Sequence, residues 1–191
     1  MSGAGTGAGR RGPPTDRRVG EVVVSAEQIA ARLPVLAREI GADLLQGDRD
    51  PVLVAVMTGA LIFAADLVRH LPVPLKLELA TVSSYPGTAV SSQGAALRGQ
   101  LPEGLAGRDV LLVDDVLDSG RTLRLLQAEI GERQPASLRT CVLLRKRIPS
   151  ALGTPCDYAG FDIPDVFVVG YGLDYDGYYR NLPAVHAMVP V

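Results

Sequence analysis

The chain has 191 residues, of which 47% are hydrophobic and 21% are charged, a composition that fits one folded domain and excludes a wholly disordered chain. Its 19 basic and 21 acidic residues give a net charge of −2, so it lacks the basic excess typical of nucleic-acid-binding proteins. The apolar runs are much shorter than the roughly 20 residues that span a bilayer. Two cysteines, Cys141 and Cys156, indicate a reducing compartment rather than a disulfide framework. We therefore expect a soluble intracellular domain that binds neither nucleic acid nor a membrane.

Residues 1–18 are rich in Gly, Arg and Pro and offer almost nothing to bury, which predicts a disordered tail before a folded domain over residues 19–191. Ser25 and Gln28 have the pattern of a capping box, which predicts the start of a helix that runs to about Leu45. The apolar residues of this stretch recur at helical spacing, so one face of the helix should pack on the core.

The next segments alternate between strand and helix. Residues 51–57 predict a buried strand, which runs into Thr58-Gly59 and a helix over 60–70. Residues 75–82 alternate apolar and polar side chains, as a half-exposed strand does. The stretch after them is rich in Ser, Gly, Pro and Gln, and a connection of that length inside a compact domain usually serves as a functional loop or flap.

Further strands are predicted at residues 110–113 and 137–144, with a helix over about 121–133 between them. Alternating strands and helices predict an α/β fold with a mainly parallel sheet, and such sheets bind ligands at the carboxyl ends of their strands. Residues 160–191 differ in pattern from the preceding segments, with short β-like runs, aromatic residues and acidic turns. We therefore expect a core over about 22–150 and a small C-terminal hood over about 156–191.

The most informative segment is 110–123, VLLVDDVLDSGRTL. Asp114 and Asp115 end a buried strand, and acceptor-only carboxylates suit the vicinal hydroxyls of a ribose or a hydrated divalent cation. The small residues after Asp118 turn the chain into a helix, where converging backbone N–H groups and the helix N-terminus form a phosphate cradle. A receiver domain also ends a strand in paired acids, but there the pair lies near the start of the domain and no phosphate cradle follows. The segment therefore predicts a site for a sugar and its phosphate.

Residues 114–123 resemble the phosphoribosyl-pyrophosphate (PRPP) loop of type I phosphoribosyltransferases: two acids, two hydrophobic residues, Asp, Ser, Gly, any residue, Thr and Leu. Other segments resemble the hypoxanthine-guanine branch of that family: LLRKRIP at 143–149, GFDIPDVFVVGYGLDY at 160–175 and YYRNLP at 178–183. The Ser84-Tyr85 pair stands where the family has its mobile flap, here residues 83–100. The resemblance implies the type I fold, a mainly parallel twisted sheet flanked by helices, with a C-terminal hood and a flexible flap loop.

The resemblance also implies the reaction. A hypoxanthine (guanine) phosphoribosyltransferase transfers the 5-phosphoribosyl group of PRPP to hypoxanthine or guanine and gives IMP or GMP and pyrophosphate, a step of purine salvage. Such an enzyme is cytoplasmic, requires Mg²⁺ and is usually a homodimer or homotetramer. Asp118 would be the general base at the purine N7, and Lys146 would favour a 6-oxo group because lysine donates hydrogen bonds and accepts none. Phe167 would stack on the base, and Arg180 would bind pyrophosphate.

The site residues implied by the resemblance fall into three sets. Those that bind PRPP or the nucleotide are Thr58, Gly59, Ser84, Tyr85, Asp114, Asp115, Val116, Leu117, Asp118, Ser119, Gly120, Arg121, Thr122 and Arg180. Those that bind the purine are Lys146, Phe167, Val168, Leu173 and Asp174. Asp174 also holds Mg²⁺, with Asp114 and Asp115 as further candidate ligands.

One motif departs from the family, and two alternative functions stay open. The family commonly has Leu-Lys-Gly after the first buried strand, where this chain has Met57-Thr58-Gly59, so this turn can offer backbone N–H groups but no cation. One alternative is a PRPP-sensing regulator that binds nucleic acid, against which the net charge and Asp118 weigh. The other is a pyrimidine or xanthine-type transferase, against which the purine-type hood weighs.

Overall fold

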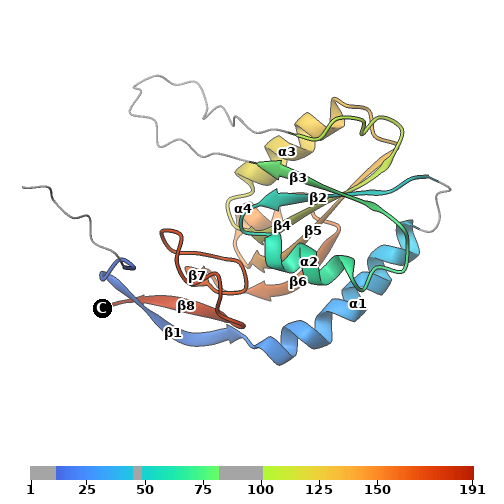
Figure 1. Cartoon of the computed structure of the whole chain (residues 1–191). Coiled ribbons are helices and arrows are strands. Elements are labelled where there is room, and N and C mark those ends of the chain that lie inside the picture. Colours follow the sequence, from blue (N-terminus) through green and yellow to red (C-terminus); the bar gives the residue numbers. More distant parts are fainter. Residues whose placement is uncertain (1–11, 45–48, 82–100) are drawn as a thin grey trace, which may run out of the picture.

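A five-stranded parallel sheet forms the central layer of the structure, a computed structural model that describes residues 12–44, 49–81 and 101–191 (Figure 1). Its strands lie in the order β3-β2-β4-β5-β6, and each neighbouring pair is parallel. Buried apolar runs in the three inner strands explain this arrangement, because a parallel sheet is covered on both faces. The strands are β2 (Val52–Met57), β3 (Lys76–Thr81), β4 (Asp109–Leu117), β5 (Ser137–Lys146) and β6 (Tyr158–Ile163).

Helices cover both faces of this sheet. Helices α1 (Ala26–Leu44) and α2 (Leu61–Val68) pack on one face, and α3 (Arg121–Gly131) packs on the other (Figure 1). Alternate residues of β2 divide between the two cores: Leu53 faces α1 and α2, and Val54 faces α3. Helix α4 (Pro149–Leu152) follows β5. The capping box at the start of α1 is present as predicted, since the Gln28 N–H donates to Ser25 Oγ at 3.2 Å.

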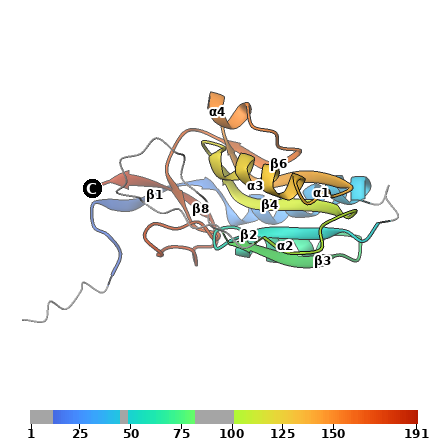
Figure 2. The same cartoon turned by 90° about the horizontal axis from the view of Figure 1, so that it is seen from above.

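A second sheet lies beyond the carboxyl ends of the main strands (Figure 2). It is antiparallel, in the order β1-β8-β7, and joins β1 (Arg17–Val24), β7 (Val168–Val169) and β8 (Val185–Pro190). We call this sheet, with the loop of residues 170–184, the hood. No helix in the described ranges is long and apolar enough to cross a membrane.

Two expected boundaries are wrong. Strand β1 begins at Arg17, inside the segment 1–18 that composition assigns to a tail, because this end of the chain pairs with β8, where Arg17 is opposite Pro190. Strand β6 lies within the range 156–191 expected for the hood, but it belongs to the main sheet because it pairs in parallel with β5. Both corrections come from pairing between strands that local composition does not encode. Residues 1–11 lie outside the described residues.

Candidate active site

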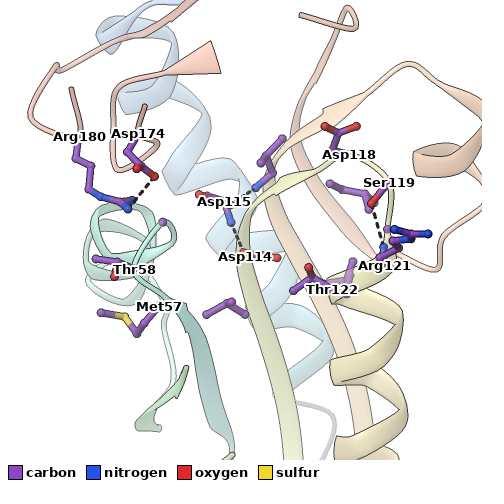
Figure 3. A pocket seen from close by; sticks show the side chains of 16 residues that line it. Met57, Thr58, Asp114, Asp115, Asp118, Ser119, Arg121, Thr122, Asp174 and Arg180 are labelled. Carbon is purple, nitrogen blue, oxygen red and sulfur yellow. Dashed lines mark hydrogen bonds and ion pairs between the residues drawn. The ribbon is translucent and has the colours of Figure 1, made fainter. Parts of the chain in front are cut away.

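A cavity of about 500 Å³ opens at the carboxyl ends of β2 and β4 (Figure 3). Its wall combines the turn after β2, the loop between β4 and α3, and two side chains of the hood. This is the edge of a parallel sheet at which ligands bind. The residues that line it are Val56 to Gly59, Asp114 to Leu123, Asp174 and Arg180.

The loop of residues 118–122, which we call the phosphate loop, leads into α3. Gly120 has φ 72°, a left-handed conformation that favours glycine, and a Cβ atom there would lie 2.1 Å from Thr154 Oγ1. Arg124 supports the loop from behind, because its guanidinium donates to the Ser119 carbonyl oxygen at 2.9 Å and to Thr154 Oγ1. The start of an eleven-residue helix thus borders the cavity on a fixed backbone turn, which is the arrangement that binds phosphate groups.

The acid pair forms the floor beside this loop. Asp114 accepts a hydrogen bond from the Asp115 N–H at 2.9 Å, and Asp115 accepts one from the Val116 N–H at 2.7 Å. Burial raises the pKa of Asp114 well above its usual range, and the neighbouring charge of Asp115 adds to the rise. Burial also raises the pKa of Asp115, against the opposing effect of the hydrogen bond from Val116. Asp114 is therefore buried and Asp115 half-buried, and both carboxyl groups line the cavity, where hydroxyl groups of a ligand could donate hydrogen bonds to them.

The turn after β2 lies against this pair. A Cβ atom at Gly59 would be 1.8 Å from Asp115 Oδ2, so only glycine allows the backbone to approach the carboxylate so closely. The peptide bond between Met57 and Thr58 is cis. The exposed Thr58 side chain brings no charge to the cavity.

The hood contributes an ion pair to the opposite wall. Arg180 lies 2.7 Å from Asp174 Oδ1 and also donates to the Gly172 carbonyl oxygen at 2.6 Å. Asp174 accepts a further hydrogen bond from the Gly177 N–H at 2.7 Å. Figure 3 shows this pair across the cavity from the phosphate loop. One cation and one carboxylate therefore face the space in front of the acid pair.

A second cavity of about 170 Å³ adjoins the first and shares Asp115, Val116, Asp118 and Asp174 with it. Its charged centre is Lys146, whose ammonium lies 2.9 Å from Asp118 Oδ2 and 3.0 Å from Asp165 Oδ1. Burial lowers the pKa of Lys146, but the two carboxylates outweigh this effect and raise the pKa above its ordinary value. The side chain is 10% exposed, so Lys146 belongs to the cavity and not to a basic surface. Apolar residues complete the wall: Val166, Phe167, Val168 and Leu173.

Comparison with known proteins assigns this site to a family. The model of the family described as "Phosphoribosyl transferase domain" matches residues 24–176. The chain is 46% identical over 175 residues to the hypoxanthine-guanine phosphoribosyltransferase of Mycobacterium avium, which covers 88% of this chain and 85% of that protein. It is 38% identical over 169 residues to the hypoxanthine phosphoribosyltransferase of Salmonella typhimurium, with 88% and 95% covered. The chain belongs to the hypoxanthine-guanine phosphoribosyltransferase family.

Solved structures of hypoxanthine-guanine and hypoxanthine phosphoribosyltransferases have the same fold as this chain. A hypoxanthine-guanine phosphoribosyltransferase from Bacillus anthracis superposes with a TM-score of 0.79 at 32% identity and covers 91% of this chain and 99% of its own. A hypoxanthine phosphoribosyltransferase from Trypanosoma cruzi, complexed with the product IMP, gives a TM-score of 0.81 at 35% identity, with 90% and 91% covered. The type I fold, the enzyme class and the role in purine salvage predicted from the sequence are thereby confirmed.

Within the described part of the chain, every predicted site residue of this phosphoribosyltransferase lines one of the two cavities. Ser84, Tyr85 and the expected flap over residues 83–100 lie outside the described residues. Leu117 is 1% exposed and packs in the core under α3, so its backbone and not its side chain meets the cavity. The role of each of these residues stays a prediction.

Three residues beside the site are absent from the sequence-based set. Asp165 forms an ion pair with Lys146. In the sequence, only its position two residues before Phe167 could have drawn attention to it. Arg124 lies one helical turn into α3, where an exposed arginine is ordinary. Arg17, whose guanidinium lies 5.4 Å from the Phe167 ring centre, has no local signal because the two residues are far apart in the sequence.

Proposed function

We propose that this chain transfers the 5-phosphoribosyl group of PRPP to the N9 atom of hypoxanthine or guanine and releases pyrophosphate. The observation that carries this proposal is the pairing of Lys146 with Asp118 at 2.9 Å in the smaller cavity. A 6-oxopurine presents O6 and N7 side by side on one edge. An ammonium and a carboxylate side by side match an edge on which O6 accepts a hydrogen bond and a protonated N7 donates one.

The rest of the smaller cavity suits a flat aromatic base. Phe167, which is 43% exposed, lines it with an apolar ring, and stacking of a base on such a ring is worth about 1–3 kcal/mol. Val116 lines the same cavity from the end of β4 and Val168 lines it from β7, so apolar surface also comes from two strands. Adenine is disfavoured because its 6-amino group would meet the donor-only ammonium of Lys146.

Asp118 would act as the general base. Its carboxylate lies 2.9 Å from the Lys146 ammonium and lines both cavities, so it would lie beside the purine N7 when the base binds. As the purine N9 bonds to the ribose C1′, the bond from C1′ to the pyrophosphate oxygen breaks, and the N7 proton passes to Asp118. A positioned base of this kind contributes about 10²–10⁴-fold to a rate.

The larger cavity would hold the ribose of PRPP together with its 5′-phosphate and its pyrophosphate. The backbone N–H groups of residues 119–122 would bind the 5′-phosphate, and Asp114 and Asp115 would bind the ribose hydroxyls. Arg180 would turn from Asp174 to the pyrophosphate, whose negative charge grows as it leaves.

A magnesium ion fits this donor set, although the described residues contain no cluster of three or more metal-ligating side chains. Mg²⁺ is commonly held by one or two carboxylates, with waters and substrate phosphates as its other ligands. Asp174, with Asp115 nearby in the wall of both cavities, offers hard oxygen atoms toward the place of the pyrophosphate. When bound, the ion would neutralise negative charge on the leaving group.

We also propose that the enzyme works in the cytoplasm as a homodimer or homotetramer. Both cysteines are free, which suits a reducing compartment. A structural study of the Trypanosoma cruzi relative links its C-terminal region to its oligomeric state and enzymatic activity. Sedimentation of the purified chain tests the assembly, and a monomer at micromolar concentration contradicts it.

The test of the proposed function is a PRPP-dependent assay over hypoxanthine, guanine, xanthine, adenine and uracil, with Mg²⁺ and with EDTA. We expect turnover of hypoxanthine and guanine, strong discrimination against adenine and uracil, and no turnover in EDTA. Binding to RNA and DNA at physiological salt is measured in parallel. Tight nucleic-acid binding without turnover would favour the regulator, and a preference for xanthine or uracil would favour the other type of transferase.

A further inference from the structure

The ring of Phe167 is held by the first strand of the chain. The Arg17 guanidinium carbon lies 5.4 Å from the centre of the ring. The ring of Tyr175 meets Phe167 edge-on, with centres 5.6 Å apart and planes at 76°. Phe167 lines the smaller cavity, which we call the purine cavity, and Arg17 does not, so Arg17 contacts the ring without lining that cavity.

The neighbouring residue Asp16 fixes the second aromatic ring. The Tyr175 hydroxyl donates to the Asp16 carboxylate, at 2.7 Å from Oδ2 and 2.8 Å from Oδ1. The backbone of Asp16 is fixed in turn, because its carbonyl oxygen accepts a hydrogen bond from the Val191 N–H at 3.1 Å. Two consecutive residues at the start of β1 therefore each hold one ring of the aromatic pair.

This support matters because of where Phe167 lies. The residue precedes β7 on the loop that follows β6 and is 43% exposed, so it lies outside the two buried cores that fix other apolar side chains. Stacking on a ring that must first be ordered is weaker than stacking on a ring already in place. A guanidinium over an aromatic face gives attraction of its own and restricts the ring.

We propose that Arg17 and Asp16 are positioning residues for the purine, which act through Phe167 and Tyr175 to present the stacking surface before the base binds. This inference rests on the proposed function. Asp16 and Arg17 lie outside residues 24–176, which the family model matches. The first strand thus contributes to base affinity without touching the base.

Kinetics of the full chain test the proposal through the Michaelis constants of the two substrates. We expect Arg17→Met to raise KM for hypoxanthine about two- to fivefold, the range given by one exposed cation–π contact. KM for PRPP and kcat should stay unchanged, because the phosphate loop and Asp118 are untouched. Arg17→Lys keeps a cation and should restore most of the affinity. Arg18→Met is the matched control, since Arg18 is exposed and successive strand residues point to opposite faces.

A spectroscopic arm tests positioning directly. The chain contains no tryptophan, so Phe167→Trp introduces a single indole at the stacking position, which can be excited selectively at wavelengths longer than tyrosine absorbs. In this background Arg17→Met and Asp16→Asn should each lower the anisotropy of the indole in the unliganded protein, and Arg18→Met should not. Equal anisotropy in all variants, or equal rises in both Michaelis constants, overturns the proposal. If wild-type protein fails to use hypoxanthine, the proposed function fails instead, and the anisotropy result still decides whether β1 orders the ring.

Discussion

The larger cavity also takes residues from the turn after β2 and from the hood, but its phosphate loop and acid pair are built differently from the smaller, purine cavity. The phosphate loop and the acid pair come from one continuous segment, residues 114–122, which is a strand, a turn and the start of a helix. The purine cavity joins the end of β4, the end of β5 and the hood, with β1 behind it. Sheet register makes this assembly possible: Leu117 is opposite Arg145, so the next residues along, Asp118 and Lys146, meet. We call the segment 114–122 the contiguous site and the purine cavity the assembled site. The geometry of the contiguous site is set within one segment of the chain, whereas that of the assembled site depends on the whole fold.

The largest effect on activity is expected from Asp118→Asn, because Asp118 lines both cavities. Asn can still take part in the turn before α3, but its amide cannot accept the N7 proton. We expect kcat to fall at least about 100-fold, while the affinity for PRPP changes little. Pre-steady-state turnover and PRPP binding by calorimetry separate the two effects. Loss of PRPP binding with normal turnover of the bound complex would make Asp118 a structural residue.

Asp114→Ala should act on the contiguous site alone. It removes a hydrogen-bonding carboxyl group from the place of the ribose, and we expect PRPP binding to weaken by about 1–3 kcal/mol. The binding of purine to the protein should be much less affected, because Asp114 does not line the purine cavity. Isothermal titration with each ligand measures both, and equal losses for the two ligands would contradict the separation of the cavities.

Asp114→Asn should stabilise the unliganded protein at neutral pH. Burial raises the pKa of Asp114, so the folded protein holds this proton more tightly than the unfolded chain. The resulting stability is complete below the unfolded pKa of about 3.9 and is lost as the pH rises through the folded pKa. Asn does not titrate, so the difference in Tm should shift in favour of the variant as the pH rises. Thermal unfolding at a series of pH values checks this, and a constant difference would show that Asp114 does not titrate in that range.

Lys146→Gln probes the assembled site. Gln can donate or accept at the purine C6 position, whereas Lys only donates. We expect kcat/KM for hypoxanthine to fall about tenfold and the preference over adenine to narrow, through loss of a charged hydrogen bond. The paired assay with both bases gives the ratio, and Arg147→Gln is the control because Arg147 is an exposed neighbour in the same basic run. An unchanged ratio would remove Lys146 from base recognition.

The smallest effect is expected from Arg124→Met, which frees the phosphate loop from its support. The variant loses the hydrogen bond to the Ser119 carbonyl oxygen, and we expect KM for PRPP to rise about two- to tenfold with KM for hypoxanthine unchanged. Arg133→Met is the control, since Arg133 also donates to a backbone oxygen, that of Glu129, but away from the site. Equal behaviour of the two variants would mean that the loop holds its shape without Arg124.

The sequence predicts the contiguous part of the molecule better than the assembled part. The strand before Asp114 and the helix after Gly120 lie where local patterns indicate, because periodicity and turn residues act over a few neighbours. The start of β1 and the sheet to which β6 belongs are mispredicted, because each depends on a distant strand. The basic run shows the same limit. Arg145 pairs with Asp162 on the adjacent strand while Lys146 reaches Asp118, a division decided by strand alternation and register.

The pairing of β1 with β8 also orders events during synthesis. Strand β1 is made among the first residues, but its partner β8 ends at Pro190, so the hood sheet cannot form until almost the whole chain is available. The parallel sheet and its phosphate loop need only residues up to β6. A nascent chain can therefore assemble the sugar-phosphate half of the site first, and the ring that meets the base is fixed only when the last strand closes on the first.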